Sequence, residues 1–319
     1  MHITINSRPY SVISSIADDV QFSADKNYLF DLDYLGGLLV KGERAQEFLQ
    51  GQVSCDVRQI NNNTMRQGVM CNLQGRILAA LDIVQREELS LVLPKDLLTA
   101  TQKTLSKPAM LSRVSIQATD DLSFLGLYVQ NPADLIPWGG QFPQDRFAVR
   151  SNENGSIYNL GNNLYVLMST ATAAAELKAK YQACHQFRGS FSWHALKLKH
   201  KQIEIYPETR GLFLPHRLDL HLTGYLNFDK GCYKGQEIIA RTHYRAKLKH
   251  HLNVFIIKNN KSLSSGDRLL KPNTELELGE VIDYSPRAHE EFLVAVSILN
   301  DHPNEVEIAQ NFVSLLTVS

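Results

Sequence analysis

Short apolar segments in the first 120 residues change repeatedly between strand and helix spacing. The patterns predict strands at 28–40, 68–73, 77–84 and 89–93, and helices at 43–50 and 95–107. Gly42 is expected to end the first of these strands, and Gln74-Gly75 is typical of a turn. This part of the chain therefore reads as an α+β unit.

The alternation continues and then gives way to strands alone. Strands are predicted at 124–129 and 165–168, a hairpin turn at Asn154-Gly155, and an alanine-rich helix at 170–183. After residue 248 the apolar runs at 252–258, 281–284, 292–299 and 306–308 indicate a small all-β unit. The expected division is two α+β parts, 1–120 and 121–246, followed by a C-terminal β-barrel at 247–319.

Composition narrows the functional classes. The chain has 319 residues, and its 33 lysine and arginine residues balance 33 acidic residues, so a nucleic-acid surface would have to be local. The sequence shows neither a signal-peptide pattern nor a long uncharged apolar run, which predicts a cytoplasmic protein that does not bind membranes. Its four cysteines are scattered without metal-ligand spacing, so no bound metal is expected.

One segment has an unusual local chemistry. Residues 230–235 form a glycine-flanked loop, Lys-Gly-Cys-Tyr-Lys-Gly, which runs into an expected short helix at 236–241. This loop is expected to expose Cys232, and the helix N-terminus together with the two lysines would favour its thiolate form. Glu237 in the first helical turn opposes that effect. The alternative is that Cys232 is simply a small residue in a turn.

The loop and helix resemble the signature of the YgfZ family, K-G-C-Y/F-x-G-Q-E-x-x-A-R. The matching residues are Lys230, Gly231, Cys232, Tyr233, Gly235, Gln236, Glu237, Ala240 and Arg241. Weaker similarity to the family, in the strand, glycine turn and helix of residues 38–57 and in Gly75-Arg76, extends the resemblance over most of residues 32–252. The family is related to the glycine-cleavage aminomethyltransferase, also called T-protein.

The resemblance implies three domains in a ring around a cavity that holds tetrahydrofolate or a derivative. Trp193 falls at the family's folate-contacting tryptophan, and Tyr34 stands where a second tryptophan is usual. The alternative for Trp193 is a core residue. The helix after Trp193 departs from the family in its lysine-rich sequence at 197–201. No flavin is expected, because no G-x-G-x-x-G follows a strand.

A further departure concerns catalysis. Related aminomethyltransferases carry an Asp-Asp pair after the glycine turn, where this chain has Ala79 and Ala80. Strand alternation from Ala79 predicts that Asp82 faces away from the site. The resemblance therefore does not imply aminomethyl transfer, and no stand-alone turnover is expected.

Three functions remain open. The first is a folate-binding accessory protein that supports iron–sulfur enzymes of tRNA modification, including methylthiolation, with Cys232 as a redox or transfer thiol. The second is a folate-dependent one-carbon transferase or demethylase, with Asp56, His216 and His221 as weak candidate bases. The third is an RNA-binding module in which the acid-free basic stretch at 241–251 contacts tRNA directly, although a solvated linker has the same composition.

Overall fold

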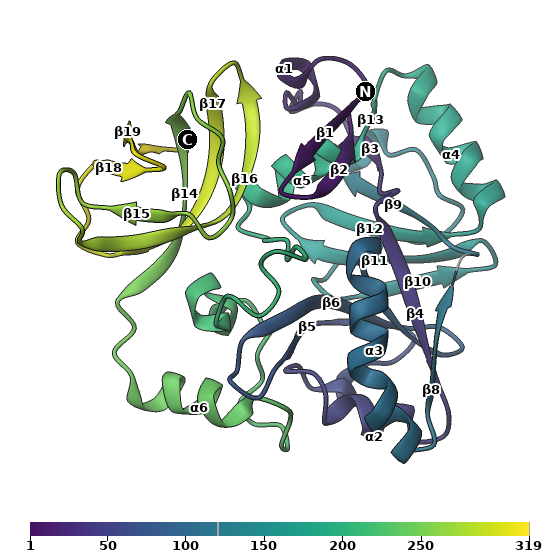
Figure 1. Ribbon diagram of the computed structural model, residues 1–319. Coiled ribbons are helices and arrows are strands. Elements are labelled where there is room, and N and C mark those ends of the chain that lie inside the picture. The colour runs from purple at the N-terminus through teal and green to yellow at the C-terminus, as the bar shows by residue number, and fades with distance from the viewer. Residues whose placement is uncertain (120, 319) are drawn as a thin grey trace.

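The computed structural model describes residues 1–119 and 121–318. The first α+β part is a five-stranded sheet with the strand order β5-β6-β7-β4-β8. One long helix, α3 (Lys95–Leu111), packs on this sheet, and α2 (Ala45–Gln50) follows β4 (Figure 1). The strands are β4 (Leu35–Lys41), β5 (Arg66–Cys71), β6 (Ile77–Gln85), β7 (Leu89–Pro94) and β8 (Ser115–Thr119).

The second α+β part is a six-stranded sheet with the order β10-β11-β12-β9-β3-β13. Two helices pack against it, α4 (Ala171–Ala183), capped by the Thr170 side chain, and α5 (Ser190–Lys199). The strands are β3 (Tyr28–Asp31), β9 (Ser123–Tyr128), β10 (Val149–Asn152), β11 (Gly155–Gly161), β12 (Leu164–Ser169) and β13 (Phe187–Arg188). The predicted hairpin turn at Asn154-Gly155 is confirmed, since it joins β10 to β11.

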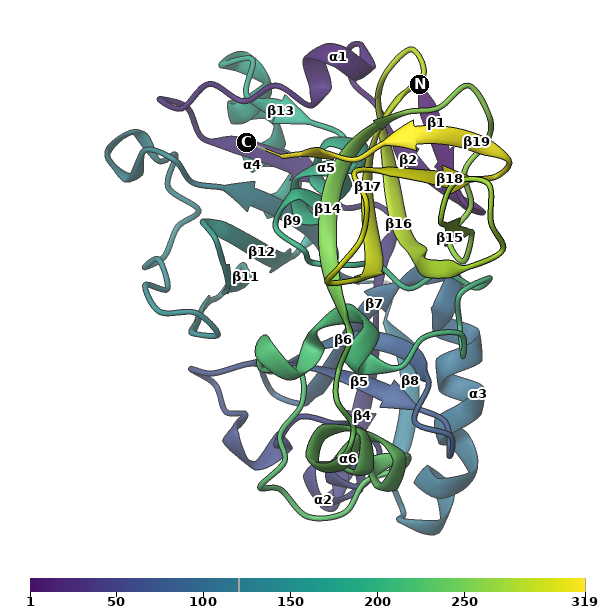
Figure 2. The ribbon, with the colours of Figure 1, turned by 90° about the vertical axis from the view of Figure 1, so that its left-hand side faces the viewer.

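The C-terminal part is a seven-stranded sheet that curls into a nearly closed barrel (Figure 2). Helix α6 (Gln236–Arg245) lies away from this barrel, and an extended segment connects the two (Figures 1 and 2). The barrel strands are β14 (His250–Lys258), β15 (Arg268–Leu270), β16 (Glu277–Ala288), β17 (Glu291–Leu299), β18 (Glu305–Ile308), β19 (Asn311–Ser314) and β20 (Leu316–Thr317). The predicted fold class, two α+β parts followed by a C-terminal barrel, is confirmed.

An N-terminal hairpin, β1 (His2–Ile5) and β2 (Arg8–Ser11), ties the parts together through buried polar groups. Arg8 donates two hydrogen bonds to Asp96 at the start of α3, at 2.7 and 2.8 Å. Tyr206 donates to Asp283 of barrel strand β16 at 2.9 Å, and Asp283 also lies 3.1 Å from His194 of α5. Since all of these groups except Asp96 are fully buried, each needs its partner, and the network fixes the hairpin, α3, α5 and the barrel in one arrangement.

One predicted element was wrong. Residues 28–40 were expected to form one strand, but they form β3 and β4 in two different sheets. The chain turns between them, where the Leu35 amide donates to the Leu32 carbonyl. Residues 32–34 contain neither glycine nor proline, so the apolar pattern does not mark this turn.

The domain boundaries remain a prediction, and two segments cross them. Strand β3, from the first predicted part, pairs with β9 of the second sheet. Conversely, the loop at 230–235 packs on residues 50–55 of the first part. Positions 120 and 319, which end two of the predicted domains, lie outside the described residues.

Candidate functional site

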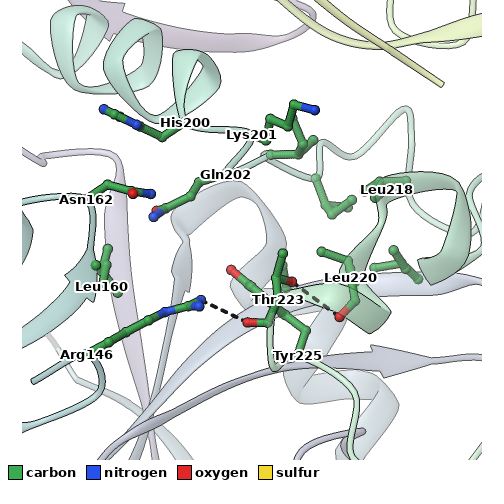
Figure 3. Close-up of a pocket in the computed structure, with 15 residues that line it drawn as sticks. Arg146, Leu160, Asn162, His200, Lys201, Gln202, Leu218, Leu220, Thr223 and Tyr225 are labelled. Carbon is green, nitrogen blue, oxygen red and sulfur yellow. Dashed lines mark hydrogen bonds between the residues drawn. The ribbon is translucent and has the colours of Figure 1, made fainter. Parts of the chain in front are cut away.

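A cavity of about 220 Å³ lies between the two α+β parts (Figure 3). Its walls come from β6, from β11 and the turn after it, and from the segment that follows α5. No described residue of the C-terminal barrel lines it. Residues from each wall include Ala80, Leu160, Asn162, Gln202, Leu220 and Tyr225.

A smaller space of about 40 Å³ shares part of this wall, and we call it the annex. Ala80, Leu160, Ile203 and Tyr225 line both spaces. The annex adds charged and aromatic groups that the larger cavity lacks, namely Asp82, Trp193, Lys197 and Glu204. The shared walls place this polar chemistry next to the larger cavity.

Asp82 corrects an inference drawn from the sequence. Ala79 is fully buried in the core, whereas Ala80 lines the cavity, so the residue two positions later on β6, Asp82, shares the cavity face. The expectation that Asp82 faces away was wrong, because it took Ala79 as the residue facing the site. The chain thus keeps a carboxyl group at this wall.

The Asp82 carboxyl is held by neutral donors and has no direct ion pair among the described residues. Gln67 donates to it at 2.9 Å and Tyr158 at 3.1 Å. Burial raises the pKa of Asp82 above its ordinary value, against the opposing effects of Lys197 and these two hydrogen bonds. A carboxyl group with a raised pKa can give or take a proton nearer to neutral pH than an exposed one.

Glu204 is the opposite case, a buried carboxylate kept charged by its partners. Lys197 donates to it at 2.7 Å, Arg8 at 3.1 Å and Tyr34 at 3.0 Å. Burial favours the neutral form, but the nearby Lys197 and Arg8 charges outweigh it and lower the pKa of Glu204. The ion pair also gives the lysine-rich departure after Trp193 a partial explanation, because Lys197 pairs with Glu204.

Cationic and amide groups surround the larger cavity. Arg146 donates to the Thr223 carbonyl at 2.9 Å, as the dashed line in Figure 3 shows, and its guanidinium lies over the Phe147 ring. His200 stands at the end of α5, where burial and the nearby Lys199 charge lower its pKa. The buried Gln202 amide oxygen has no hydrogen-bond partner among the described residues. An unpartnered acceptor in a cavity wall suits a ligand that donates hydrogen bonds.

The two residues expected to contact the ligand are both buried. Trp193 on α5 is 1% exposed, packs 5.3 Å from the Phe30 ring, and reaches the annex with part of its side chain. Tyr34 lines neither space, and its hydroxyl is committed to Glu204. Ligand contact by either residue stays a prediction.

The loop that carries Cys232 lies at a different place. Cys232 is exposed, as expected, at a wide depression that shares no lining residue with the cavity or the annex. The helix predicted after the loop is confirmed as α6, and Gly235 precedes it with a φ of 86°. A side chain on Gly235 would collide with the Asn72 carbonyl, so this motif glycine is required by the backbone.

Lys230 does not supply the charge expected beside Cys232. Its ammonium group turns inward and donates to the carbonyl oxygens of Gln50, Val53 and Cys55 at 2.8, 2.6 and 2.7 Å. Burial lowers the pKa of Lys230 to about 8. The motif lysine thus anchors the loop to the first α+β part rather than facing the thiol.

The other motif residues divide between the loop and the helix surface. The Gln236 side chain accepts a hydrogen bond from the Tyr233 amide at 3.1 Å, which closes the loop. Glu237 and Arg241 are exposed on α6, and Gly231 has open space where a side chain would lie. Gln236 thus has a local structural role, whereas Gly231 is not required by packing.

The weak candidate bases have other surroundings. Asp56 forms an ion pair with Arg58, whose hydrogen bonds hold the pKa of this carboxyl at about 2 against the effect of burial. His216 and His221 lie 5.1 Å apart, and burial lowers the pKa of His216 to about 4. His243 stacks on Phe228 at 3.8 Å beside them. None of these groups lines the cavity or the annex.

Sequence reasoning missed Lys197, Gln202, Glu204 and Arg146 as site residues. Among the site residues, only Asp82 could have been found from the sequence, because it lies two residues from Ala80 on one strand and therefore faces the same side. The described residues contain no group of three or more potential metal ligands, and no described helix is long and apolar enough to cross a membrane.

The fold is aminomethyltransferase-like. The crystal structure of the glycine cleavage system aminomethyltransferase T from Bartonella henselae matches with a TM-score of 0.73, over 100% of this chain and 93% of that chain, at 14% identity. No family model matches the sequence.

Curated relatives narrow the class to a family. The chain is 27% identical to the tRNA-modifying protein YgfZ of Colwellia psychrerythraea over 231 residues, or 71% of either chain. It is 28% identical to the protein of that name from Klebsiella pneumoniae, over 70% of either chain, and 27% identical to that of Photorhabdus laumondii, over 86% of this chain and 82% of the relative. Together with the fold, these relatives support assignment of the chain to the YgfZ family.

Proposed function

We propose that this protein is a folate-binding accessory factor in tRNA modification. The relatives are named tRNA-modifying proteins, and the chain has an aminomethyltransferase-like fold and a loop whose sequence resembles the YgfZ signature. In this proposal it supports iron–sulfur enzymes that methylthiolate tRNA, and it works in the cytoplasm. Tetrahydrofolate or a derivative occupies the central cavity.

The observation that carries the proposal is the chemistry of the cavity wall. A folate has a flat ring system whose edge both donates and accepts hydrogen bonds, and a negatively charged glutamate tail. The unpartnered Gln202 oxygen and the Asp82 carboxyl offer acceptors to such an edge. The positive charges of Arg146 and Lys201 at the wall suit the negative tail. The residues present therefore fit the ligand.

The size of the cavity sets how the ligand would sit. Ligand pockets usually span about 300 to 1,000 Å³, and this cavity of about 220 Å³ lies below that range. It suits the ring system of a folate better than the whole molecule. The glutamate tail would extend out past the cationic groups. When bound, tetrahydrofolate supplies one-carbon chemistry at its ring nitrogens.

Asp82 favours one alternative, a folate-dependent one-carbon transferase or demethylase. An enzyme of this kind needs a proton donor or acceptor beside the ligand, and Asp82 is a carboxyl group with a raised pKa at the cavity wall. Lys197 lies near enough to lower the pKa of Asp82, so its charge would stabilise the carboxylate after proton loss. Turnover of a folate by the isolated protein would establish this alternative.

Cys232 would act outside the cavity. It is exposed, its loop is anchored by Lys230, and its depression is separate from the cavity. We propose it as a redox or transfer thiol that meets a partner at the surface. The depression is open enough for a protein partner to reach the sulfur.

Complementation tests the proposal as a whole. Cells that lack the native protein would receive the wild type, Cys232→Ala or Ala80→Phe, and methylthiolated nucleosides of tRNA would be measured by mass spectrometry. The proposal expects restored modification with the wild type and a loss with either variant. Full restoration by both variants would contradict it. A Cys184→Ala variant, at another exposed cysteine, is the matched control for the thiol.

A further inference from the structure

Helix α6 and the segment after it present an exposed basic face. Arg241 and Arg245 are exposed on the helix, one turn apart, and Lys247 and Lys249 are exposed in the segment that leads to β14. We call these four side chains the basic face. None of the four makes an ion pair or a side-chain hydrogen bond with any described residue.

This arrangement differs from the rest of the protein. The chain as a whole has no net charge, and several other cations are paired, such as Arg217 with Glu280 and Lys178 with Asp31. Residues 238–251 contain no acid, and the nearest one on the helix is Glu237, one turn before Arg241. Arg245 lies in the last turn of α6 and suits the C-terminal end of the helix dipole, but Arg241 lies before that turn and Lys247 and Lys249 lie beyond the helix. The basic face is thus a local excess of positive charge.

An exposed aromatic ring lies within the basic face. Tyr244, next to Arg245, is 68% exposed. Its ring centroid lies 4.8 Å from that of His243 in a T-shaped contact, and His243 itself stacks on Phe228 at 3.8 Å. Tyr244 thus contacts other rings on one side and is largely open to solvent.

We propose that the basic face binds RNA, with its cations on phosphates and Tyr244 stacked on an unpaired base. Single-stranded nucleic acid is commonly held by cations that follow the backbone together with aromatic rings that stack on bases. The inference rests on the proposed role in tRNA modification and deepens it by naming where RNA is held. An acidic protein could form ion pairs with the cations, but it has no base to stack on the exposed Tyr244 ring.

The position of the basic face relates it to the other sites. Helix α6 begins at the Cys232 loop, so RNA on the basic face lies one helix length from the exposed thiol. Residues of the basic face line neither the cavity nor the annex. RNA binding and folate binding are therefore expected to be separable.

The test is fluorescence anisotropy with a labelled, unmodified tRNA transcript at several salt concentrations. One variant carries Arg245→Gln, Lys247→Gln and Lys249→Gln, and its matched control carries Lys258→Gln, Arg268→Gln and Lys271→Gln on the barrel surface. The basic-face variant should bind at least about tenfold more weakly at low salt, with a salt dependence reduced by about two to three in log–log slope. The barrel variant should bind like the wild type.

Two further variants test the aromatic contact. Tyr244→Ala should weaken binding about fivefold or more, whereas Tyr244→Phe should keep it, because stacking needs only the ring. The inference is overturned if the wild type does not bind the transcript, or if the two triple variants lose equal affinity. It is also overturned if poly-glutamate competes as well as RNA and Tyr244→Ala has no effect, which would indicate an acidic protein partner. Calorimetric tetrahydrofolate binding should be unchanged in every variant, so a failure of RNA binding is distinct from a failure of the folate proposal.

Discussion

The ammonium group of Lys197 lies 2.7 Å from a carboxylate oxygen of Glu204, in the wall of the annex. Arg8 of the N-terminal hairpin reaches another oxygen of the same carboxylate at 3.1 Å. The N-terminal hairpin and α5 therefore both form ion pairs with the buried Glu204 carboxylate beside the cavity, and these ion pairs help to set the shape of the site. The arrangement also keeps the second carboxyl in the annex, Asp82, free of a direct ion pair.

Removing the Glu204 charge should destabilise the fold. In Glu204→Gln, Lys197 keeps its charge but loses its carboxylate partner, while Arg8 keeps its ion pair with Asp96. Removing one partner of a buried ion pair costs about 3 kcal/mol. Denaturant unfolding of the variant should show a loss of this order. The exposed Glu208→Gln is the control and should stay within about 0.5 kcal/mol of the wild type. Equal stability of the two variants would contradict the assigned role.

Asp82 should make stability depend on pH. Its pKa is raised in the folded state, so the folded protein holds the proton more tightly than the unfolded chain does. The wild type therefore loses stability as the pH rises from the unfolded pKa, near 4, through the folded one. Asp82→Asn has no such titration. In thermal unfolding from pH 4.5 to 8, the stability of the variant relative to the wild type should therefore increase with pH. A constant difference in stability between the two proteins across this range would show that the pKa of Asp82 is not raised.

Substitution by alanine should destabilise the protein at Gly126 but not at Gly231. A side-chain carbon on Gly126 would lie 2.6 Å from the Trp193 indole, so Gly126→Ala should cost about 1 to 3 kcal/mol and move the tryptophan. Gly231 has nothing within 4 Å of that position, so Gly231→Ala should leave the free energy of unfolding nearly unchanged. Tryptophan fluorescence and urea unfolding report both effects. An unaffected Gly126→Ala would mean that Trp193 is loosely packed.

Lys230 should stabilise the Cys232 loop rather than activate its thiol. Lys230→Met leaves three carbonyl oxygens without their donor, which should cost about 3 kcal/mol. Lys234→Met, in the same loop, should cost far less, because no side-chain hydrogen bond of Lys234 is found in the described structure. Urea unfolding compares the two, and the reaction rate of Cys232 with a disulfide reagent separates the roles. An unchanged stability with a slower thiol in Lys230→Met would restore the activating role.

The sequence predicted the elements well where the apolar period was long, as in α3 and β6. It failed at residues 32–34, where a turn without glycine or proline sends the chain from one sheet to another. The Cys232 loop and α6 were predictable because Gly235 and the charge pattern act locally. The annex was not, because Arg8, Asp82, Lys197 and Glu204 meet only through the tertiary fold.

The ligand contacts show the same limit. Trp193 and Tyr34 were selected from the family resemblance, and the resemblance gives their positions in the chain but not their burial. Strand alternation counted from Ala79 predicts that Asp82 faces away from the site. The same rule counted from Ala80, which lines the cavity, places Asp82 in the site.

The most direct test of the account is calorimetric binding of tetrahydrofolate to three proteins. Ala80 lines both the cavity and the annex, so Ala80→Phe fills them, while Ala118→Phe places the same ring on the exposed strand β8. The account predicts saturable binding at one site by the wild type and by Ala118→Phe, and at least a tenfold loss in Ala80→Phe. Absence of binding by the wild type, or equal binding by all three proteins, would contradict a folate site in this cavity.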